Sequence, residues 1–397
     1  MKIGAVLFDD PYVAKEGWAS SGEEAMRING HGELDSDTLW VTNVPFPKWR
    51  ELTLNNTSNI LHSQYMRTTI EHISKELNIV GDPINAVKAA ASIYNGAVEY
   101  GQKNYDVSIL TPGYRYSNLV ADRVFPSHMR SSPDIVFRTR LMNAFKESTQ
   151  ENQAMSAKQV PSGSSIYSFV FPRGTYAKWL LNMPVPVGTK WKEIKKSQNT
   201  TTIGVREGEV VKGTKAVVKK LMGMGEDNAL FLKVVVKYTD RAYRNFASFG
   251  NGSNHIRSWV TLPELLTLIK YSVVELHGGF MTELGYLNVT QEKENETEFS
   301  YSKGIFMDNL WISLATPKYR DKYTAVGAYL RAYDRAMCFK VAESMVMDHG
   351  FTVGSYGAGR IQTYLREGEL PYALEAGLNS NVIPQLCMKT DGVNDEH

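Results

Sequence analysis

The middle of the chain carries the pattern that most restricts its fold, a regular exchange of apolar and polar side chains. From about residue 166 to 257, short runs with this period of two are separated by turn residues, as in half-buried strands. In the run 229–246, the alternation predicts one face with Leu232, Val234, Val236 and Tyr238 and an opposite face with Lys233, Lys237, Arg241 and Tyr243. The run 200–213 predicts a hairpin with Glu207 and Gly208 near its turn, and 215–223 is expected to continue the β-rich pattern.

Most of the remaining chain has apolar residues at helical spacing. The predicted helices span about residues 57–77, 84–100, 134–151, 262–276, 317–348 and 358–367, with a short helix after Pro371. Near the N-terminus, strands are expected at about 3–8 and 38–44.

These patterns predict an α+β fold, with a β-rich basic middle section flanked by helical N- and C-terminal parts. Three domains are expected from the length and the changes of pattern. They are a mixed α/β part over 1–160, a β-rich basic domain over 161–300 and a helical part over 301–397.

The composition excludes several classes of protein. The 397 residues are 43% hydrophobic and 22% charged, with a net charge of +2, which excludes an intrinsically disordered chain. Two cysteines, Cys338 and Cys387, cannot form a disulfide framework and favour a reducing compartment. The longest apolar windows stay below the about 18 residues of a membrane helix, and the N-terminal apolar run is too short for a signal peptide. The sequence therefore predicts a cytoplasmic protein without membrane contact.

The familiar catalytic and cofactor motifs do not occur in the sequence. It has no Walker A loop, Rossmann fingerprint, nucleophile elbow, HExxH or CxxC, so we expect no cofactor and no metal site, and an enzyme is disfavoured. The glycine-rich stretch 354–359 fits either a turn or an anion-binding loop, and the turn is the simpler interpretation.

The near-neutral net charge conceals a strong asymmetry along the chain. The section from Arg173 to Arg257 holds 16 basic and six acidic residues, a net charge of +10 over 85 residues. The rest of the chain holds 28 basic and 36 acidic residues, a net charge of −8. Such charge patterning indicates a surface that meets a polyanion or an acidic protein.

Aromatic residues accompany the basic ones in this section, a combination typical of proteins that bind single-stranded nucleic acid. Cations contact the phosphates, and flat rings stack on the bases. The sequence therefore predicts a largely nonspecific groove for single-stranded DNA or RNA. Its predicted residues are Lys190, Lys192, Lys195, Lys196, Lys215, Lys219, Lys220, Lys233, Lys237, Arg241, Tyr243, Arg244 and Arg257.

Three other interpretations stay open at this point. The lysines are also compatible with an ordinary solvated surface, and the aromatic residues with a core. A basic section can instead meet the acidic part of a second copy, giving a homo-oligomer such as a shell, a filament or a virion subunit. Finally, scattered carboxylates can form a catalytic site, for which Asp9, Asp10, Glu23 and Glu24 are the first candidates.

Overall fold

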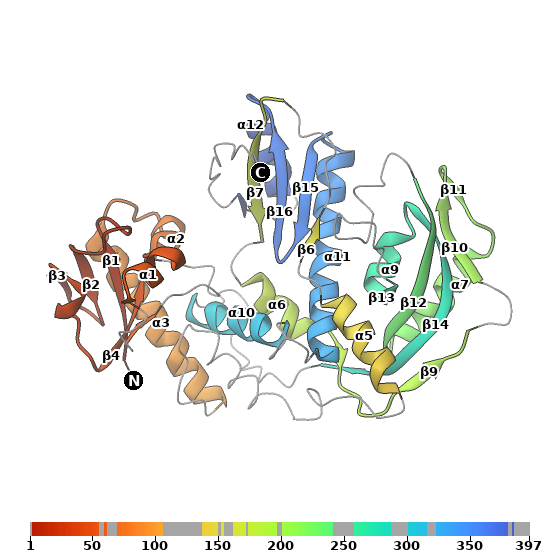
Figure 1. Cartoon of the computed structure of the whole chain (residues 1–397), viewed down its shortest axis with the longest axis horizontal. Helices are drawn as coiled ribbons and strands as arrows, with labels where there is room; N and C mark the ends of the chain where they lie inside the picture. The colour runs from red at the N-terminus through yellow and green to blue at the C-terminus, as the bar shows by residue number, and fades with distance from the viewer. Residues whose placement is uncertain are drawn as a thin grey trace. The chain divides into compact units, whose positions relative to one another are not determined.

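The computed structural model describes residues 2–54, 59–61, 70–105, 137–149, 152–154, 162–171, 174–196, 201–240, 258–286, 301–315, 323–379 and 383–384. These residues form two compact units, each built from three separate stretches of the chain (Figure 1). Unit 1 comprises residues 1–126, 173–181 and 288–314, and unit 2 comprises 127–172, 182–287 and 315–397.

Unit 1 contains a five-stranded sheet in the order β3-β2-β1-β4-β5. Its strands are β1 (Lys2–Phe8), β2 (Gly17–Ser20), β3 (Ala25–Ile28), β4 (Thr38–Thr42) and β5 (Ile60–Leu61). Strand β1 is parallel to β4 and antiparallel to β2. Its helices are η1 (His31–Glu33), α1 (Phe46–Glu51), α2 (Ile70–Glu76), α3 (Pro83–Tyr105) and most of α6 (Thr175–Asn182) and α10 (Tyr301–Ala315).

Helix α3 is fixed to the first strand of unit 1 by a side-chain amide. Asn95 accepts a hydrogen bond from the Ile3 N–H (3.1 Å) and donates one to the Ile3 carbonyl oxygen (2.7 Å). Within the same unit, α6 and α10 share an aromatic core in which Tyr176 stacks on Trp311 at 5.0 Å.

The first sheet of unit 2 holds the basic section. Its main path is β11-β10-β14-β12-β13, and two short strands, β8 and β9, also pair with β14. The strands are β8 (Val185–Pro186), β9 (Lys192–Ile194), β10 (Thr201–Arg206), β11 (Glu209–Val210), β12 (Asn228–Thr239), β13 (Trp259–Thr261) and β14 (Ser272–Gly285).

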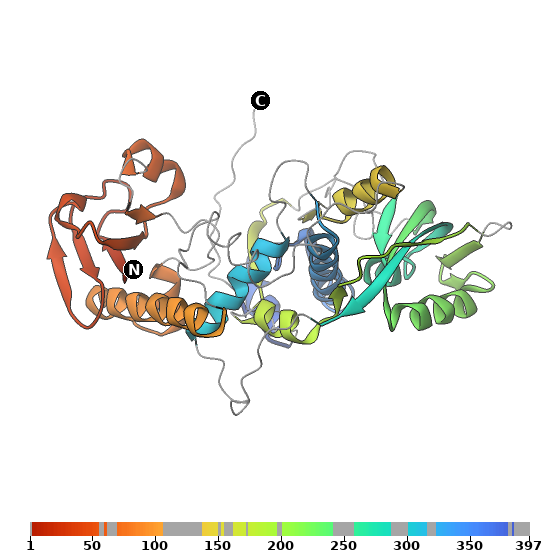
Figure 2. The ribbon, with the colours of Figure 1, turned by 90° about the horizontal axis from the view of Figure 1, so that it is seen from below.

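Helices cover this sheet on both sides. On one face, Leu221 of α7 (Thr214–Gly225) and Leu265 of α9 (Leu262–Leu268) form a buried core with Leu232 and Val234 of β12. On the other face, Phe145 of α5 (Arg138–Ser148) packs on Phe231 at 5.2 Å. Figure 2 shows α5 (gold) and α7 (green) on opposite sides of the strands.

The second sheet of unit 2 has the order β17-β7-β16-β15-β6. Its strands are β6 (Asn152–Ala154), β7 (Ser165–Val170), β15 (Thr352–Gly357), β16 (Arg360–Leu365) and β17 (Ile383–Pro384), and α12 (Leu370–Asn379) contributes Ala373 to its core. The long helix α11 (Ala325–Met347) packs on this sheet through Phe339, Ala342 and Met345.

Helix α11 also carries two buried charged residues that bond to different parts of unit 2. Asp334 is fully buried and accepts the Gly359 N–H at the β15–β16 turn (3.1 Å). Arg335 donates to the Glu264 carboxylate of α9 (2.8 Å) and to the Ser148 carbonyl of α5 (2.7 Å). One helix turn therefore connects both sheets of the unit.

The mixed α and β fold class is confirmed, as are the N-terminal strands and the hairpin turn. Glu207 and Gly208 adopt φ values of 53° and 82°, the left-handed geometry of a tight hairpin. The division into three domains at residues 160 and 300 stays a prediction.

Four predicted elements are wrong. Within the predicted helix 57–77, Ile60 and Leu61 form strand β5, which pairs with β4, and the described helix α2 begins at Ile70. Residues 215–223 form helix α7, because Val217, Val218, Leu221 and Met224 recur at helical rather than strand spacing. The predicted helix 262–276 ends at residue 268 and gives way to strand β14. The predicted helix 358–367 is strand β16, whose alternate residues Ile361, Thr363 and Leu365 are buried.

Candidate nucleic-acid interface

The face of the first unit 2 sheet that carries α5 is only partly covered by that helix. Phe231, Trp259 and Phe280 are buried at the α5 end, where Arg140 lies over the Phe280 ring at 4.9 Å. Farther along β12 on this face, Lys233, Val235 and Lys237 are exposed and Tyr238 is half-buried. We call this second part the open face. It comprises Lys196, Arg206, Lys233, Val235, Lys237, Tyr238, Glu275 and His277.

The alternation predicted for β12 holds as far as Val236. Leu232, Val234 and Val236 face the α7 side, where they contribute to the core, and Lys233 and Lys237 are exposed. The prediction for Tyr238 is wrong, because the register shifts between Val236 and Tyr238. Val236 pairs with Val274, whereas Tyr238 pairs with the adjacent Val273 and so points to the opposite face. The bulge thereby adds an aromatic ring to the lysine-bearing face.

Arg206 approaches the same ring from the end of β10, on the far side of β14. Its guanidinium lies 5.3 Å from the centroid of Tyr238, within the range of a cation–π contact. In that row, the buried Val273 of β14 lies between Gly204 of β10 and Tyr238 of β12, and Gly204 adds no side chain of its own. Arg206 was absent from the predicted site, because strand alternation does not reveal which β12 residue it approaches.

A carboxylate lies among the cations of the open face. The Glu275 side chain is only 13% exposed, and its carboxylate oxygens lie 2.8 Å from the Lys237 ammonium and 2.9 Å from Nε2 of His277. The pKa of its carboxyl group is lowered, chiefly by the hydrogen bond to Lys237, with smaller contributions from Lys237, His277 and Lys196 as charges. Glu275 is therefore ionised and neutralises part of the basic surface.

A second bulge positions His277 and Lys196. Gly278 has φ of 81°, and the chain between β9 and β10 passes so close that a Cβ there would overlap the Ile194 carbonyl oxygen. The backbone nitrogen of Lys196 lies beside the same glycine. Apart from His277, the open face holds four cations against one carboxylate.

The structure divides the predicted lysines between the two faces of the sheet. Lys196, Lys233 and Lys237 belong to the open face, and Lys190 and Lys195 are exposed at the ends of β9. Lys215, Lys219 and Lys220 are exposed on α7, and Lys192 points to the same side, because Ile194 packs in the α7 core. Arg241, Tyr243, Arg244 and Arg257 lie outside the described residues.

Most aromatic residues of the basic section that the structure describes belong to the core. Tyr176 is buried against Trp311, Trp191 packs on Phe145 at 5.5 Å, and Trp259 stacks on Phe280 at 5.7 Å. For these residues the core interpretation of the sequence was the right one. Among the rings described in this section, Tyr238 is the one that lies with the open-face lysines.

Two of the four carboxylates suggested as a catalytic site, Asp9 and Asp10, make local structural contacts. Arg27 forms ion pairs with Asp9 and Glu16, and Asp10 accepts the Tyr12 N–H in a turn. In the part of the chain that the structure describes, no three His, Cys, Asp or Glu residues are arranged to hold a metal ion. The glycine-rich stretch 354–359 is a hairpin turn whose Gly359 N–H bonds to Asp334.

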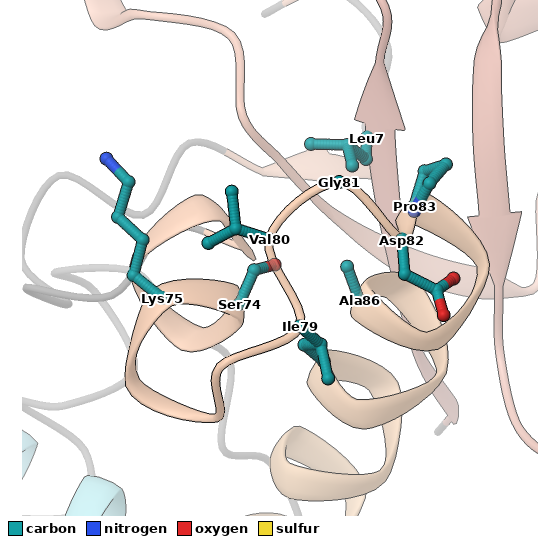
Figure 3. Close-up of a pocket in the computed structure, with 9 residues that line it drawn as sticks. All are labelled: Leu7, Ser74, Lys75, Ile79, Val80, Gly81, Asp82, Pro83 and Ala86. Carbon is teal, nitrogen blue, oxygen red and sulfur yellow. The ribbon is translucent and has the colours of Figure 1, made fainter.

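Unit 1 contains a pocket of about 180 Å³ between the end of β1 and the α2–α3 turn, shown in Figure 3. Its lining is mostly apolar, from Leu7, Ile79, Val80, Pro83 and Ala86. The polar groups at its edge are already bonded: the Ser74 hydroxyl donates to the Ile70 carbonyl, and the Asp82 carboxylate accepts from Asn85.

Across the described helices, none has the length and apolarity needed to span a membrane.

Comparisons with known proteins add little. No family model and no curated protein matches the chain. Among solved structures, it is similar to Phi29 DNA polymerase complexed with single-stranded DNA, with a TM-score of 0.42 and 10% identity over 91% of this chain and 80% of that one. The ternary complex of that polymerase with primer-template DNA and incoming nucleotide gives 0.41 and 10% over the same shares, and its orthorhombic crystal form gives 0.40 and 10% over 94% and 82%. Similarities this weak support no conclusion about this chain.

Proposed function

We propose that this protein binds single-stranded DNA or RNA, with little dependence on base sequence, on the open face of unit 2. The observation that carries the proposal is the β12 bulge, which places the Tyr238 ring on the same face as Lys233 and Lys237. Phosphate-binding cations and a ring for base stacking are the two kinds of group that such binding needs.

The spacing of the cations fits an extended backbone. Lys233 and Lys237 are four residues apart on one strand, about 13 Å at 3.3 Å per residue. Lys196, after β9, and Arg206, at the end of β10, border the same surface. A strand laid along β12 can therefore contact several cations in succession, and the affinity then falls steeply with salt.

A mobility-shift assay with labelled single-stranded oligonucleotides over a salt series tests the proposal. We expect wild-type protein to shift the oligonucleotide at low salt and to lose the shift as salt rises. A triple variant with Lys196→Glu, Arg206→Glu and Lys233→Glu should weaken the affinity by more than about tenfold. The matched control reverses the charge of three exposed lysines of unit 1 by substitution with Glu, at Lys2, Lys15 and Lys75. This control should retain the shift.

The role of the ring is tested separately from that of the charge. Tyr238→Leu keeps an apolar side chain but removes stacking, so we expect about a five- to 100-fold loss of single-strand affinity. The affinity for duplex DNA, in which the bases are already stacked, should change little. A wild-type protein that shifts no oligonucleotide at low salt contradicts the proposal, as does a triple variant that binds normally.

A further inference from the structure

Helix α7 carries a second basic surface, which we call the lysine ridge: Lys212, Lys215, Lys219 and Lys220. All four side chains are exposed. The 14 residues from Lys212 to Gly225 contain no acidic residue. Within the described part of the chain, none of these ammonium groups is in an ion pair, in contrast to Lys237 on the open face. The ridge is therefore a concentration of unneutralised positive charge.

The ridge and the open face are separated by the core of the sheet. Val217, Val218 and Leu221 point from α7 into that core, where they meet Leu232 and Val234 of β12. Lys233, between the last two residues, points the opposite way. A nucleic-acid strand lying along the open face cannot reach α7 without passing around an edge of the sheet.

The position of the ridge on the helix is costly for stability. Lys215 is the second residue of α7, and Lys212 immediately precedes its N-cap residue, Gly213. The N-terminus of a helix carries partial positive charge, so a cation there destabilises the helix. A bound anion removes this repulsion, because it is attracted both to the lysines and to the helix end.

The ridge has dimensions that suit a phosphate backbone. Lys215 and Lys219 are four residues apart and share one side of the helix, about 6 Å apart along its axis. Within α7, Lys215 to Lys220 spans about 7.5 Å along the axis, the rise of roughly two stacked nucleotides, and Lys212 lies just before the helix start. Thr214 and Leu221 are buried on the inner side, so the helix presents its lysines outward.

We infer that the lysine ridge is a second, independent phosphate-backbone site, and that the protein joins two segments of nucleic acid across one sheet. The inference rests on the proposed function for the open face and extends it from binding to bridging. The ridge offers cations without a neighbouring ring, so it contacts phosphates and accepts single strands and duplexes alike.

A two-oligonucleotide capture assay tests the inference. One biotinylated oligonucleotide is immobilised and saturated with the full chain, unbound protein is washed away, and a fluorescent second oligonucleotide is added. Wild-type protein should retain the second oligonucleotide. A ridge variant with Lys215→Gln, Lys219→Gln and Lys220→Gln should retain about tenfold less. Its binding to the first oligonucleotide should fall less than about twofold, because the open face is intact.

The matched control replaces Lys2, Lys15 and Lys75 of unit 1 by Gln and should bridge like the wild type. Equal thermal unfolding midpoints show that the variants are folded. If the ridge variant captures the second oligonucleotide normally, the inference is wrong. Capture would then occur by another route, such as two open faces on associated copies. If the ridge variant alone loses binding of the first oligonucleotide and the open-face variant does not, the proposed function of the open face is wrong instead.

Discussion

Arg335 and Glu264 form an ion pair of 2.8 Å between helices α11 and α9, with side-chain exposures of only 2% and 1%. A charge left without its partner at this depth is strongly unfavourable. We expect Glu264→Ala to lower the free energy of unfolding by about 3–5 kcal/mol, measured by urea denaturation. The exposed pair between Lys270 and Glu343 serves as the control, and Lys270→Ala should cost about 0–1 kcal/mol. Equal losses at the two sites would contradict this account.

The bulge at Gly278 makes a second prediction. Alanine there would adopt φ of 81° and overlap the Ile194 carbonyl, so Gly278→Ala should destabilise the protein by about 2–4 kcal/mol. Gly223 on α7 has open space around its Cα, and Gly223→Ala should stabilise by about 0.5–1 kcal/mol. The denaturant midpoints of the two variants test this prediction. A lower midpoint for both variants would contradict it.

Glu275 competes with phosphate for Lys237, so its removal should strengthen binding. We expect Glu275→Gln to raise the affinity for single strands several-fold and to steepen the dependence of log K on log salt by up to about one. Fluorescence anisotropy over a salt series measures both. Glu193→Gln is the control, because Glu193 pairs with Arg140 at the part of the face near α5. Unchanged or weaker binding by Glu275→Gln would show that phosphate does not compete for Lys237.

Tyr329 predicts how the stability changes in alkali. Burial, with a smaller contribution from Tyr333, raises the pKa of Tyr329 to about 12. Between pH 10 and 12 the unfolded chain loses this proton while the folded protein keeps it, so the free energy of unfolding falls as pH rises. The loss from this group should be on the order of 2–3 kcal/mol by pH 12.

Denaturation curves from pH 9 to 12 test this effect. Tyr329→Phe should flatten the curve, since it removes the titrating group, whereas Tyr12→Phe at an exposed site should leave it unchanged. A Tyr329→Phe protein that loses stability with pH as steeply as the wild type would assign the effect to other groups.

The sequence predicts the open face better than its surroundings. Leu232, Val234 and Val236 alternate with Lys233 and Lys237 as expected, because one side of β12 faces a core and the other faces solvent. Tyr238 breaks the rule at a bulge. A register shift depends on the partner strand and leaves no mark in the alternation of β12 itself.

The wrong predictions have a common physical origin in short segments. Residues 215–223 contain adjacent valines that fit a strand, but their burial against β12 and α9 needs the helical spacing of Val217, Leu221 and Met224. Gly278 and Gly279 resemble a helix end, yet they lie inside β14, where close backbone approach excludes side chains. Tertiary contacts determine the secondary structure of such short segments, and the local sequence pattern does not reveal those contacts.

The two units are interleaved along the chain, which crosses between them at residues 126/127, 172/173, 181/182, 287/288 and 314/315. No single continuous gene segment therefore encodes either one. Recombination cannot exchange one unit for a homologous one in a single step, and a single proteolytic cut leaves the two units covalently joined. Exchange of either unit therefore requires coordinated replacement of three separate stretches of the chain.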